Sequence, residues 1–546
     1  MKYSAYILSA ILSFTLVSCA DFLSEENKSS LSDQYYNTEA GVRDLTDACY
    51  TPLRYWFGKE KASNFAGSCT DIMTRAKGHT NQAIVNYSSG FTADNSELYS
   101  LWGYNYQALN FCNEALDRLS KIDMNDGERL TGEVSFLRAV YSWIIAEMWG
   151  DTHYTTIPSK GVITTANYTS VNDIYTQIFA DLEVAISNCP ETTEEGGRVT
   201  KWAAKAMKAR MLLTRGEKEA AADLAKEIID NGPFNLFDDY TALWDMSNSE
   251  GSTNSECIWY VNYTSNLLLD NELDNAAQER SGNNLHLMYG MKYDVESGMV
   301  RDIENGRPFN RYMPTRFLLE LFDQENDQRY QGSFKTVWYM NNPESKGDYV
   351  NMTDTAIYLV AGTIPDAEYD RVALKYQLKG IDDLYADDGT PKTARDVTFQ
   401  LSKFDDPTRP AVATVESARD FFVFRISEMY LIVAEGYMES NPSTALSYLN
   451  TLRKKRAITG HENAMEVSAS DLTLDFILNE RARELCGEEL RWFDLKRTGK
   501  LVERVRAYNP DGSPNITENH NVRPFPQDFL DAIQNKDDFK QKAGYN

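Results

Sequence analysis

Residues 472–497, LTLDFILNERARELCGEELRWFDLKR, decide the fold class. Their apolar side chains recur near helical spacing: Phe476, Ile477, Leu485 and Trp492. Charged side chains fill the positions between them: Glu480, Arg481, Arg483, Glu484, Glu488 and Arg491. This pattern predicts one long amphipathic helix whose opposite charges, three or four residues apart, meet along its surface. Taken by itself, the segment indicates a structural helix rather than a functional site.

The order of residues within this stretch carries two motifs, ERAREL at 480–485 and RWFDLKR at 491–497. Further motifs lie elsewhere in the chain: CADFL at 19–23, FLRA at 136–139, WGD at 149–151, RPFP at 523–526 and FKQKAGY at 539–545. Together they resemble the SusD/RagB family, surface lipoproteins of Bacteroidetes that capture nutrients, mostly glycans. Lys542 and Ala543 depart from the family's usual ending, and the resemblance is weakest over 237–332.

The first 18 residues predict a lipoprotein signal peptide. Lys2 supplies a positive charge, residues 7–17 form a short apolar run, and small residues lead into Cys19. The run is short for a membrane span, and its end resembles a bacterial lipobox, in which the cysteine is acylated after cleavage. We therefore expect Cys19 to anchor the protein in the outer membrane, facing the cell exterior, through the polar residues 20–40.

The net charge of −26 restricts the class of partner. Binding to nucleic acid needs a basic face for the phosphates, so this balance argues against it. It also disfavours broad adhesion to anionic lipid. A neutral ligand fits the charge of this chain better than a polyanion does.

Helices are predicted over 38–50, 96–121, 128–149, 171–187, 202–214, 218–231, 421–439 and 443–456. Neighbouring helices are joined by short turns and carry small residues at close approach, which resembles tetratricopeptide-type hairpins, although the full repeat consensus is not met. Between 237 and 420, Gly, Asn, Asp and Pro punctuate short β-like pieces at 257–260, 336–339, 357–360 and 397–401. Long irregular segments of this kind usually carry function.

The expected fold is therefore mainly α, a SusD-like fold with tetratricopeptide-type hairpins and a loop-rich, partly β insert. After the signal peptide (1–18), the predicted parts are an N-terminal helical region, 19–236, and a C-terminal SusD/RagB region, 237–546. The C-terminal region is predicted to be loop-rich over 237–420 and helical over 421–546.

The sequence shows no reactive constellation. Carboxylates adjacent in sequence, at 238–239, 382–383, 387–388 and 488–489, do not establish the spacing that a glycosidase needs across a sugar. The five histidines lack zinc-binding spacing, and neither a nucleotide-binding glycine loop nor a nucleophile elbow occurs. Residues 387–389 lack the alternating ligands of a calcium loop. We expect no catalysis, metal or cofactor.

The six cysteines after Cys19 select no disulfide pairing, and Cys112 and Cys486 are predicted core residues.

Aromatic residues are the remaining source of binding chemistry, at 9 Trp, 32 Tyr and 24 Phe. Flat rings suit the apolar face of a sugar, and neighbouring polar groups can bond its hydroxyls. The family resemblance implies a site built from loops near the first helical pair and the mid-chain insert. The ligand-binding residues that we predict from it are Trp102 and Trp338 as platforms, with Asp71, Arg75, Asn105, Tyr289 and Tyr293. Trp149 and Trp492 are predicted core residues.

The sequence therefore predicts a surface lipoprotein that binds a glycan. By resemblance, we expect it to deliver that glycan to a SusC-like TonB-dependent transporter. One alternative is a lipid-anchored hydrolase of polysaccharide or peptide, which predicts convergent carboxylates with perturbed protonation. Another is a helical-repeat adaptor, which predicts no exposed aromatic platform.

Overall fold

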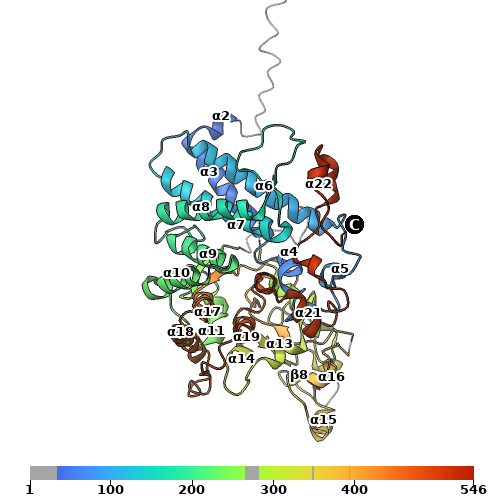
Figure 1. The fold of residues 1–546 in the computed structure, drawn as a ribbon. Coiled ribbons are helices and arrows are strands. Elements are labelled where there is room, and N and C mark those ends of the chain that lie inside the picture. The colour runs from blue at the N-terminus through green and yellow to red at the C-terminus, as the bar shows by residue number, and fades with distance from the viewer. Residues whose placement is uncertain (1–32, 265–281, 347–349, 393, 546) are drawn as a thin grey trace, which may run out of the picture.

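The computed structural model describes residues 33–264, 282–346, 350–392 and 394–545 (Figure 1). Cys19 and the signal peptide lie outside these residues. The helices of the upper part are α2 (Asp33–Tyr36), α3 (Glu39–Tyr50), α4 (Glu60–Ala62), α5 (Gln82–Val85), α6 (Ser96–Leu119), α7 (Gly127–Trp149), α8 (Val171–Asn188), α9 (Lys201–Thr214) and α10 (Lys218–Asn231). Side-chain caps fix several starts: Asn95 accepts from the backbone N–H groups of Glu97 and Leu98, and Thr200 accepts from that of Ala203.

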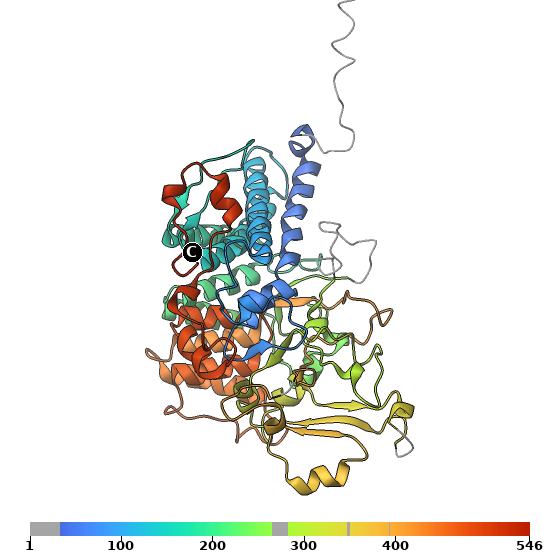
Figure 2. The same cartoon turned by 90° about the vertical axis from the view of Figure 1, so that its right-hand side faces the viewer.

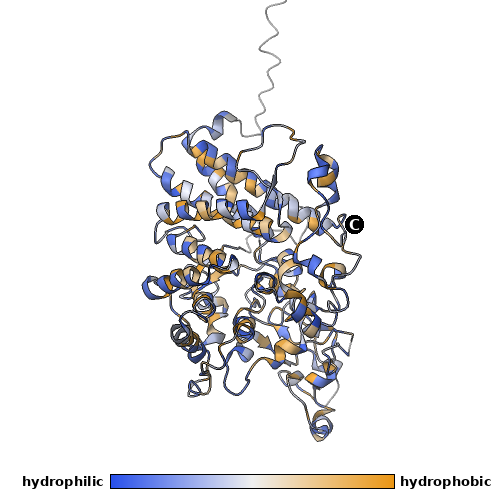
Figure 3. Cartoon of the chain, in the orientation of Figure 1, coloured by the Kyte–Doolittle hydropathy of each residue, from blue (hydrophilic) through white to orange (hydrophobic). Residues whose placement is uncertain are grey.

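The long helices pack neighbour against neighbour from α6 through α10, and α17 (Ile426–Gly436) continues the row, followed by α18 (Pro442–Lys455). A Cβ added at Gly436 would lie 2.4 Å from the carbonyl oxygen of Lys218, so α17 and α10 approach more closely than a larger residue permits. The predicted hairpins are confirmed, and residues 237–420 are looped out between two adjacent helices. Figure 3 shows hydrophobic and hydrophilic residues alternating along these helices, as packed amphipathic helices require.

The looped-out region contains small sheets, as predicted. The strands of the described chain, of which β4 to β10 lie in this region, are β1 (Met73–Arg75), β2 (Thr152–His153), β3 (Tyr168–Thr169), β4 (Cys257–Val261), β5 (Tyr312–Pro314), β6 (Phe334–Lys335), β7 (Val337–Tyr339), β8 (Thr355–Val360), β9 (Gln377–Gly380), β10 (Gln400–Leu401) and β11 (Phe421–Arg425). Antiparallel pairs form between β1 and β5, β2 and β3, β4 and β11, and β6 and β10; β7–β8–β9 is a three-stranded sheet in which β8 and β9 are parallel. The remaining helices are α11 (Tyr240–Leu243), α12 (Leu285–Met288), α13 (Arg316–Glu320), α14 (Arg329–Ser333), α15 (Asp366–Val372), α16 (Ile381–Leu384), α19 (Leu474–Leu485), α20 (Arg491–Arg497), α21 (Leu501–Tyr508) and α22 (Gln527–Ala532).

Two predicted helices were wrong in extent. Residues 472–497 form two helices, α19 and α20, because the chain turns between them at Gly487 (φ 81°) and Glu489 (φ 60°). Residues 421–425 of the predicted helix 421–439 are strand β11, which pairs with β4 before α17 begins. Residues 421–424 are apolar enough for a strand or a helix, so strand pairing decided that segment, whereas turn geometry divided 472–497.

The predicted surface position of the α19 charges was also wrong. Glu480 and Glu484 have no exposed surface, and Arg481 and Arg483 are buried. Glu484 binds three arginines from distant segments, namely Arg329, Arg425 and Arg456. The motif therefore belongs to a buried ionic cluster that ties the insert and α17–α18 to α19.

The four residues that were predicted individually to lie in the core are confirmed there. Trp149 and Trp492 have no exposed surface, and Cys112 and Cys486 are buried core residues. The six cysteines of the described chain are unpaired. Within the described ranges no helix is both long enough and apolar enough to cross a bilayer.

Candidate ligand-binding site

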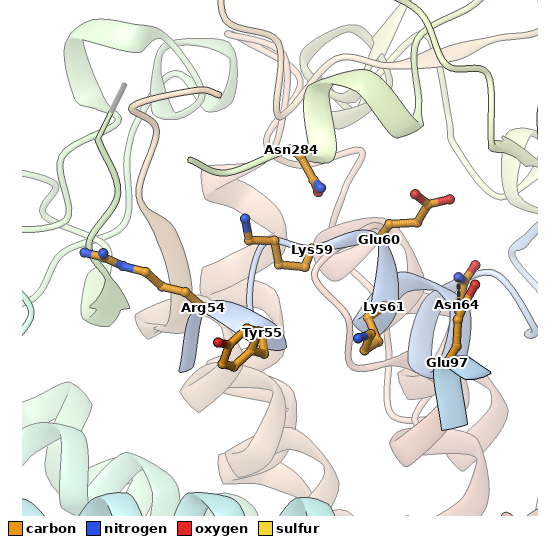
Figure 4. A pocket seen from close by; sticks show the side chains of 8 residues that line it. All are labelled: Arg54, Tyr55, Lys59, Glu60, Lys61, Asn64, Glu97 and Asn284. Atoms are coloured by element: carbon orange, nitrogen blue, oxygen red, sulfur yellow. Dashed lines mark hydrogen bonds between the residues drawn. The ribbon is translucent and has the colours of Figure 1, made fainter. Parts of the chain in front are cut away.

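A hollow of about 160 Å³ opens at the middle of the molecule, where the segment after α3 meets α6 and the looped-out region (Figure 4). The chain there runs from the 3₁₀ helix Thr51–Tyr55 through α4 to the π-helix Ser63–Gly67. The hollow is lined by Arg54, Tyr55, Lys59, Glu60, Lys61, Asn64, Glu97 and Asn284. Figure 4 shows Lys59 and Asn284 on one side, with Tyr55 and Lys61 facing them from the other. The hollow thus combines an aromatic ring with both signs of charge and two amides.

Tyr55 supplies the aromatic part of the wall, and its ring stacks on Tyr104, which does not itself line the hollow. The rings of Tyr55 and Tyr104 lie parallel, with centroids 3.7 Å apart and planes 1° apart. The Lys61 ammonium nitrogen lies 4.7 Å from the centroid of the Tyr104 ring, a cation–π arrangement. Tyr104 comes from α6, so the first long helix fixes one ring and the 3₁₀ helix fixes the other. Paired, braced rings keep a defined orientation without a ligand.

The polar groups are held by a short hydrogen-bond chain. The Asn64 amide donates to Glu97 over 2.7 Å, and its carbonyl oxygen accepts from the Tyr312 hydroxyl, also over 2.7 Å. The Lys59 ammonium group donates to the backbone oxygen of Gly282 over 2.6 Å. These bonds orient carboxylate and amide groups of the kind that recognise sugar hydroxyls.

Glu60 has a perturbed protonation equilibrium. Burial raises its pKa to about 7, while Arg311, whose Nε lies 2.8 Å from the Glu60 Oε1, opposes the shift and the Glu97 charge adds to it. Two carboxyl groups in one hollow, one with a raised pKa, are part of what the hydrolase alternative predicts. The arrangement alone therefore does not separate binding from hydrolysis.

A second hollow of about 310 Å³ adjoins the first at Arg54, which lines both. It is lined by Asp47, Tyr50, Thr51, Leu53, Arg54, Glu195, Gly196, Gly197, Arg198, Tyr260, Val261 and Asn262. Arg54 donates to the backbone oxygen of Asn262 over 3.1 Å and lies over the Tyr263 ring, which places it as the ridge between the hollows. We call the two hollows together the Arg54 cleft. The cleft has room for more than one sugar-sized unit, lined by rings and polar groups.

The residues predicted from sequence do not line the Arg54 cleft. Trp338 and Tyr293 have no exposed surface, and Tyr289 is 2% exposed. The Asp71 carboxylate is buried between Arg491 and Arg504, which outweigh the effect of burial and hold its pKa below its usual range. Expected as an open platform, Trp338 instead is fully buried in the β7–β8–β9 sheet, where its partner across the β7–β8 pair is the equally buried Ile357.

Trp102, Asn105 and Arg75 are also placed elsewhere. Trp102 is 8% exposed and borders a different hollow near α22, and the Asn105 amide bonds the Leu101 carbonyl within α6. Half-buried Arg75 lies 3.7 Å from Asp511. Asp71 and Arg75 thus share a neighbourhood with residues 491–511, while Trp102 and Trp338 lie far apart in the fold. A ligand-binding role for these seven residues stays a prediction.

Sequence reasoning missed residues 54–64, RYWFGKEKASN, which supply six of the eight residues that line the first hollow. The available signal was the alternation of aromatic and charged residues in a short segment before the first long helix.

Comparison with known proteins identifies the family. The SusD family model matches residues 255–542, and a second model, described as starch-binding associating with outer membrane, matches residues 21–213. The chain belongs to the SusD family. The SusD-like protein P25 of Formosa agariphila is 24% identical over 96% of this chain and 95% of its own, and the SusD-like protein P2 of the same organism is 23% identical over 98% of both.

Solved structures agree with the fold. A laminarin-binding SusD-like protein superposes with a TM-score of 0.69 at 22% identity, covering 93% of this chain and all of that one. Surface glycan-binding protein A of Bacteroides thetaiotaomicron, solved with laminarihexaose, gives a TM-score of 0.67 at 20% identity over 92% of this chain and 99% of that one. The SusD family consists of non-catalytic, glycan-binding proteins associated with the outer membrane, so the family assignment favours binding over the hydrolase alternative.

Proposed function

We propose that this SusD-family protein captures a glycan in the Arg54 cleft at the outer face of the outer membrane and delivers it to a SusC-like TonB-dependent transporter. The observation that carries the proposal is the Tyr55 ring in the cleft wall, braced by Tyr104 and accompanied by Glu97, Asn64 and Lys61. A pyranose offers an apolar C–H face for the rings and a rim of hydroxyls for the polar groups. The glycan-binding proteins of the same fold supply independent support.

Binding to immobilised glycans tests this proposal. We would measure the affinity of the full chain for laminarihexaose first, because two structural neighbours bear that class of ligand in their names, and then for a panel of other oligosaccharides. Tyr104→Ala removes the ring that braces Tyr55 in the cleft wall, and it is expected to lower the affinity for the best ligand roughly tenfold, about 1.4 kcal/mol. Glu97→Gln should weaken it as well, since it removes a charged acceptor.

The matched control is Tyr99→Ala. Tyr99 lies on the same helix and is 52% exposed, but it neither lines the cleft nor stacks on Tyr55 as Tyr104 does. If Tyr99→Ala weakens binding as much as Tyr104→Ala does, the ligand does not lie in the Arg54 cleft. Indifference of the wild-type protein to every glycan favours the adaptor alternative.

The hydrolase alternative makes a separate demand. Incubation with the bound glycan would release products, and Glu60→Gln would abolish that release because the amide cannot donate an acid proton. We expect retention of intact glycan by both the wild-type and the variant protein. Chromatography of the incubated oligosaccharide distinguishes the two results.

The lipid anchor rests on the lipobox-like sequence before Cys19. Cys19→Ala is expected to leave the protein without acyl chains and to move it from the membrane fraction to the soluble fraction. Continued membrane retention of that variant would contradict the anchor. The transporter partner rests on family membership, and co-purification of a TonB-dependent transporter with the affinity-tagged lipoprotein would test it.

A further inference from the structure

The loop formed by residues 155–167 exposes three aliphatic side chains. Ile157 is 71% exposed, Val162 95% and Ile163 58%. Single exposed aliphatic residues are ordinary on a protein surface, but three within seven residues of one loop form a patch. Glycan capture in the Arg54 cleft does not use this loop, because none of its residues lines the cleft.

The shape of the loop is held by hydrogen bonds from two sides. On the α6 side, Asn110 accepts from the backbone N–H of Ser159 over 2.8 Å, and the Asn113 amide donates to the Thr155 carbonyl over 2.9 Å. On the C-terminal side, the backbone N–H of Gln534 donates to the Thr164 carbonyl over 2.7 Å. These bonds brace the loop with its aliphatic side chains turned outward.

An apolar hollow of about 490 Å³ lies beneath the loop. Its wall includes the rings of Trp102, Tyr106, His153 and Phe529. The amides at its rim already bond the loop: Asn110 and Asn113 as above, and Asn167 through its own amide to the Tyr154 carbonyl over 2.7 Å. Ile157 and Ile163 also line this hollow, so apolar groups would find a continuous surface from the loop inward.

The loop lies at the same end of the molecule as the start of the described chain. In Figures 1 and 2 the loop, α22 and α2 lie at one end of the molecule, and α15 lies at the opposite end. Asp33, the first residue of α2, follows Cys19 by 14 residues, which span at most about 50 Å when fully extended. An acyl group on Cys19 therefore brings this end of the molecule, rather than the α15 end, toward the bilayer.

We propose that the 155–167 loop is a membrane-contacting element whose Ile157, Val162 and Ile163 side chains enter the interface of the outer leaflet. This inference rests on the proposed lipid anchor, which supplies most of the attraction and confines the loop near lipid. Exposed charges of both signs stand nearby: Lys160 lies within the loop itself, and Asp528 and Asp531 lie on α22. The lipid face is therefore expected to be zwitterionic rather than anionic.

A single fluorescent label tests the contact on the lipidated full chain. The six cysteines of the described chain are buried and the Cys19 thiol would be acylated, so Val162→Cys provides one reactive thiol for an environment-sensitive nitrobenzoxadiazole label. In phosphatidylcholine vesicles the label is expected to shift its emission to the blue and to be quenched by doxyl-labelled lipid. The matched control is Leu374→Cys, equally labelled: Leu374 is 73% exposed and follows α15 at the far end, so its emission should stay water-like and unquenched.

A second variant isolates the aliphatic side chains. With the label at Ser159→Cys, the triple change Ile157→Ser, Val162→Ser and Ile163→Ser should abolish the lipid quenching, and the exposed positions of these side chains leave the fold intact. Flotation of the vesicles in a density gradient shows whether the protein is anchored. If the protein floats with the vesicles but its Val162→Cys label keeps a water-like emission, the loop proposal alone is overturned. A protein that does not float with the vesicles overturns the anchor and the loop proposal with it. A blue shift of the label emission that occurs only when a transporter is added also overturns the loop proposal, because the loop would then contact protein rather than lipid.

Discussion

Arg425 and Glu484 form a salt bridge between two fully buried side chains, with Nη1 and Oε1 3.1 Å apart, although 59 residues separate them in sequence. Glu484 also binds Arg456 at 2.8 Å and Arg329 at 3.3 Å. The arginines also share other carboxylates, and Glu256 contacts two of the three arginines, Arg425 and Arg456. Glu484 is thus the central anion of a cluster that joins β11, α14, α18 and α19.

Removal of that anion is expected to destabilise the fold strongly. Glu484→Ala leaves three buried guanidinium groups with less compensation, and breaking a buried ion pair in this way costs about 3–5 kcal/mol. Denaturant unfolding of the variant measures the loss. The control is Glu503→Ala, which removes an exposed carboxylate beside Lys500 and should cost less than about 1 kcal/mol. Equal losses for the two variants would contradict a central role for the buried cluster.

The same cluster shows where sequence reasoning reached its limit. The helices of the array were predictable because their apolar stripes are local, and Asn95 and Thr200 mark where two of them begin. The burial of Glu484 was not predictable, because its partners Arg329, Arg425 and Arg456 come from segments that periodicity cannot relate. From the pattern alone, charges that alternate with apolar residues indicate a solvated helix face. Ion pairs with distant segments can instead bury them, as they do at Glu484.

Two glycines are expected to respond in opposite directions to alanine. Gly487 has φ +81°, and an added Cβ would lie 2.4 Å from a methyl carbon of Leu401, so Gly487→Ala should lower stability by more than about 1 kcal/mol. Gly103 lies inside α6 with nothing within 4 Å of an added Cβ, so Gly103→Ala should raise stability by about 0.5–1 kcal/mol. Thermal melting of both variants measures the difference, and a stabilising Gly487→Ala would show that the turn after α19 is not strained.

The raised pKa of Glu60 predicts a pH-dependent difference in stability. A carboxyl with an unfolded pKa near 4.3 and a folded pKa of about 7 is held as the acid by the folded protein, so its contribution to stability falls as pH rises between these values. Glu60→Gln removes this dependence. The melting temperature of the variant minus that of the wild type should therefore increase from about pH 4 to pH 7 and then level off. A difference that is constant over this range would place the Glu60 pKa near its usual value.

The candidate site was less predictable than the fold for a related reason. Tyr55 and Tyr104 were each visible as aromatic residues, but their parallel stacking depends on how the 3₁₀ helix docks on α6. Context in sequence did not separate exposed rings from core rings either: all nine tryptophans are buried, Trp338 included. Side-chain burial follows from tertiary packing, which composition and turn content do not specify.

The neighbours Trp338 and Tyr339 allow the difference between a core ring and an exposed ring to be measured. Trp338 is fully buried in β7, so Trp338→Ala should lower the free energy of unfolding by about 3–5 kcal/mol through the cavity it creates. Tyr339 is 56% exposed on the same strand, and Tyr339→Ala should change stability by much less. Trp338→Phe, which keeps an apolar ring, gives folded protein for an affinity measurement, and we expect glycan affinity within about twofold of the wild type, well under the tenfold that corresponds to 1.4 kcal/mol. Lost affinity with an unchanged melting temperature would instead place Trp338 in contact with the ligand, and would require the lower sheet to open on binding.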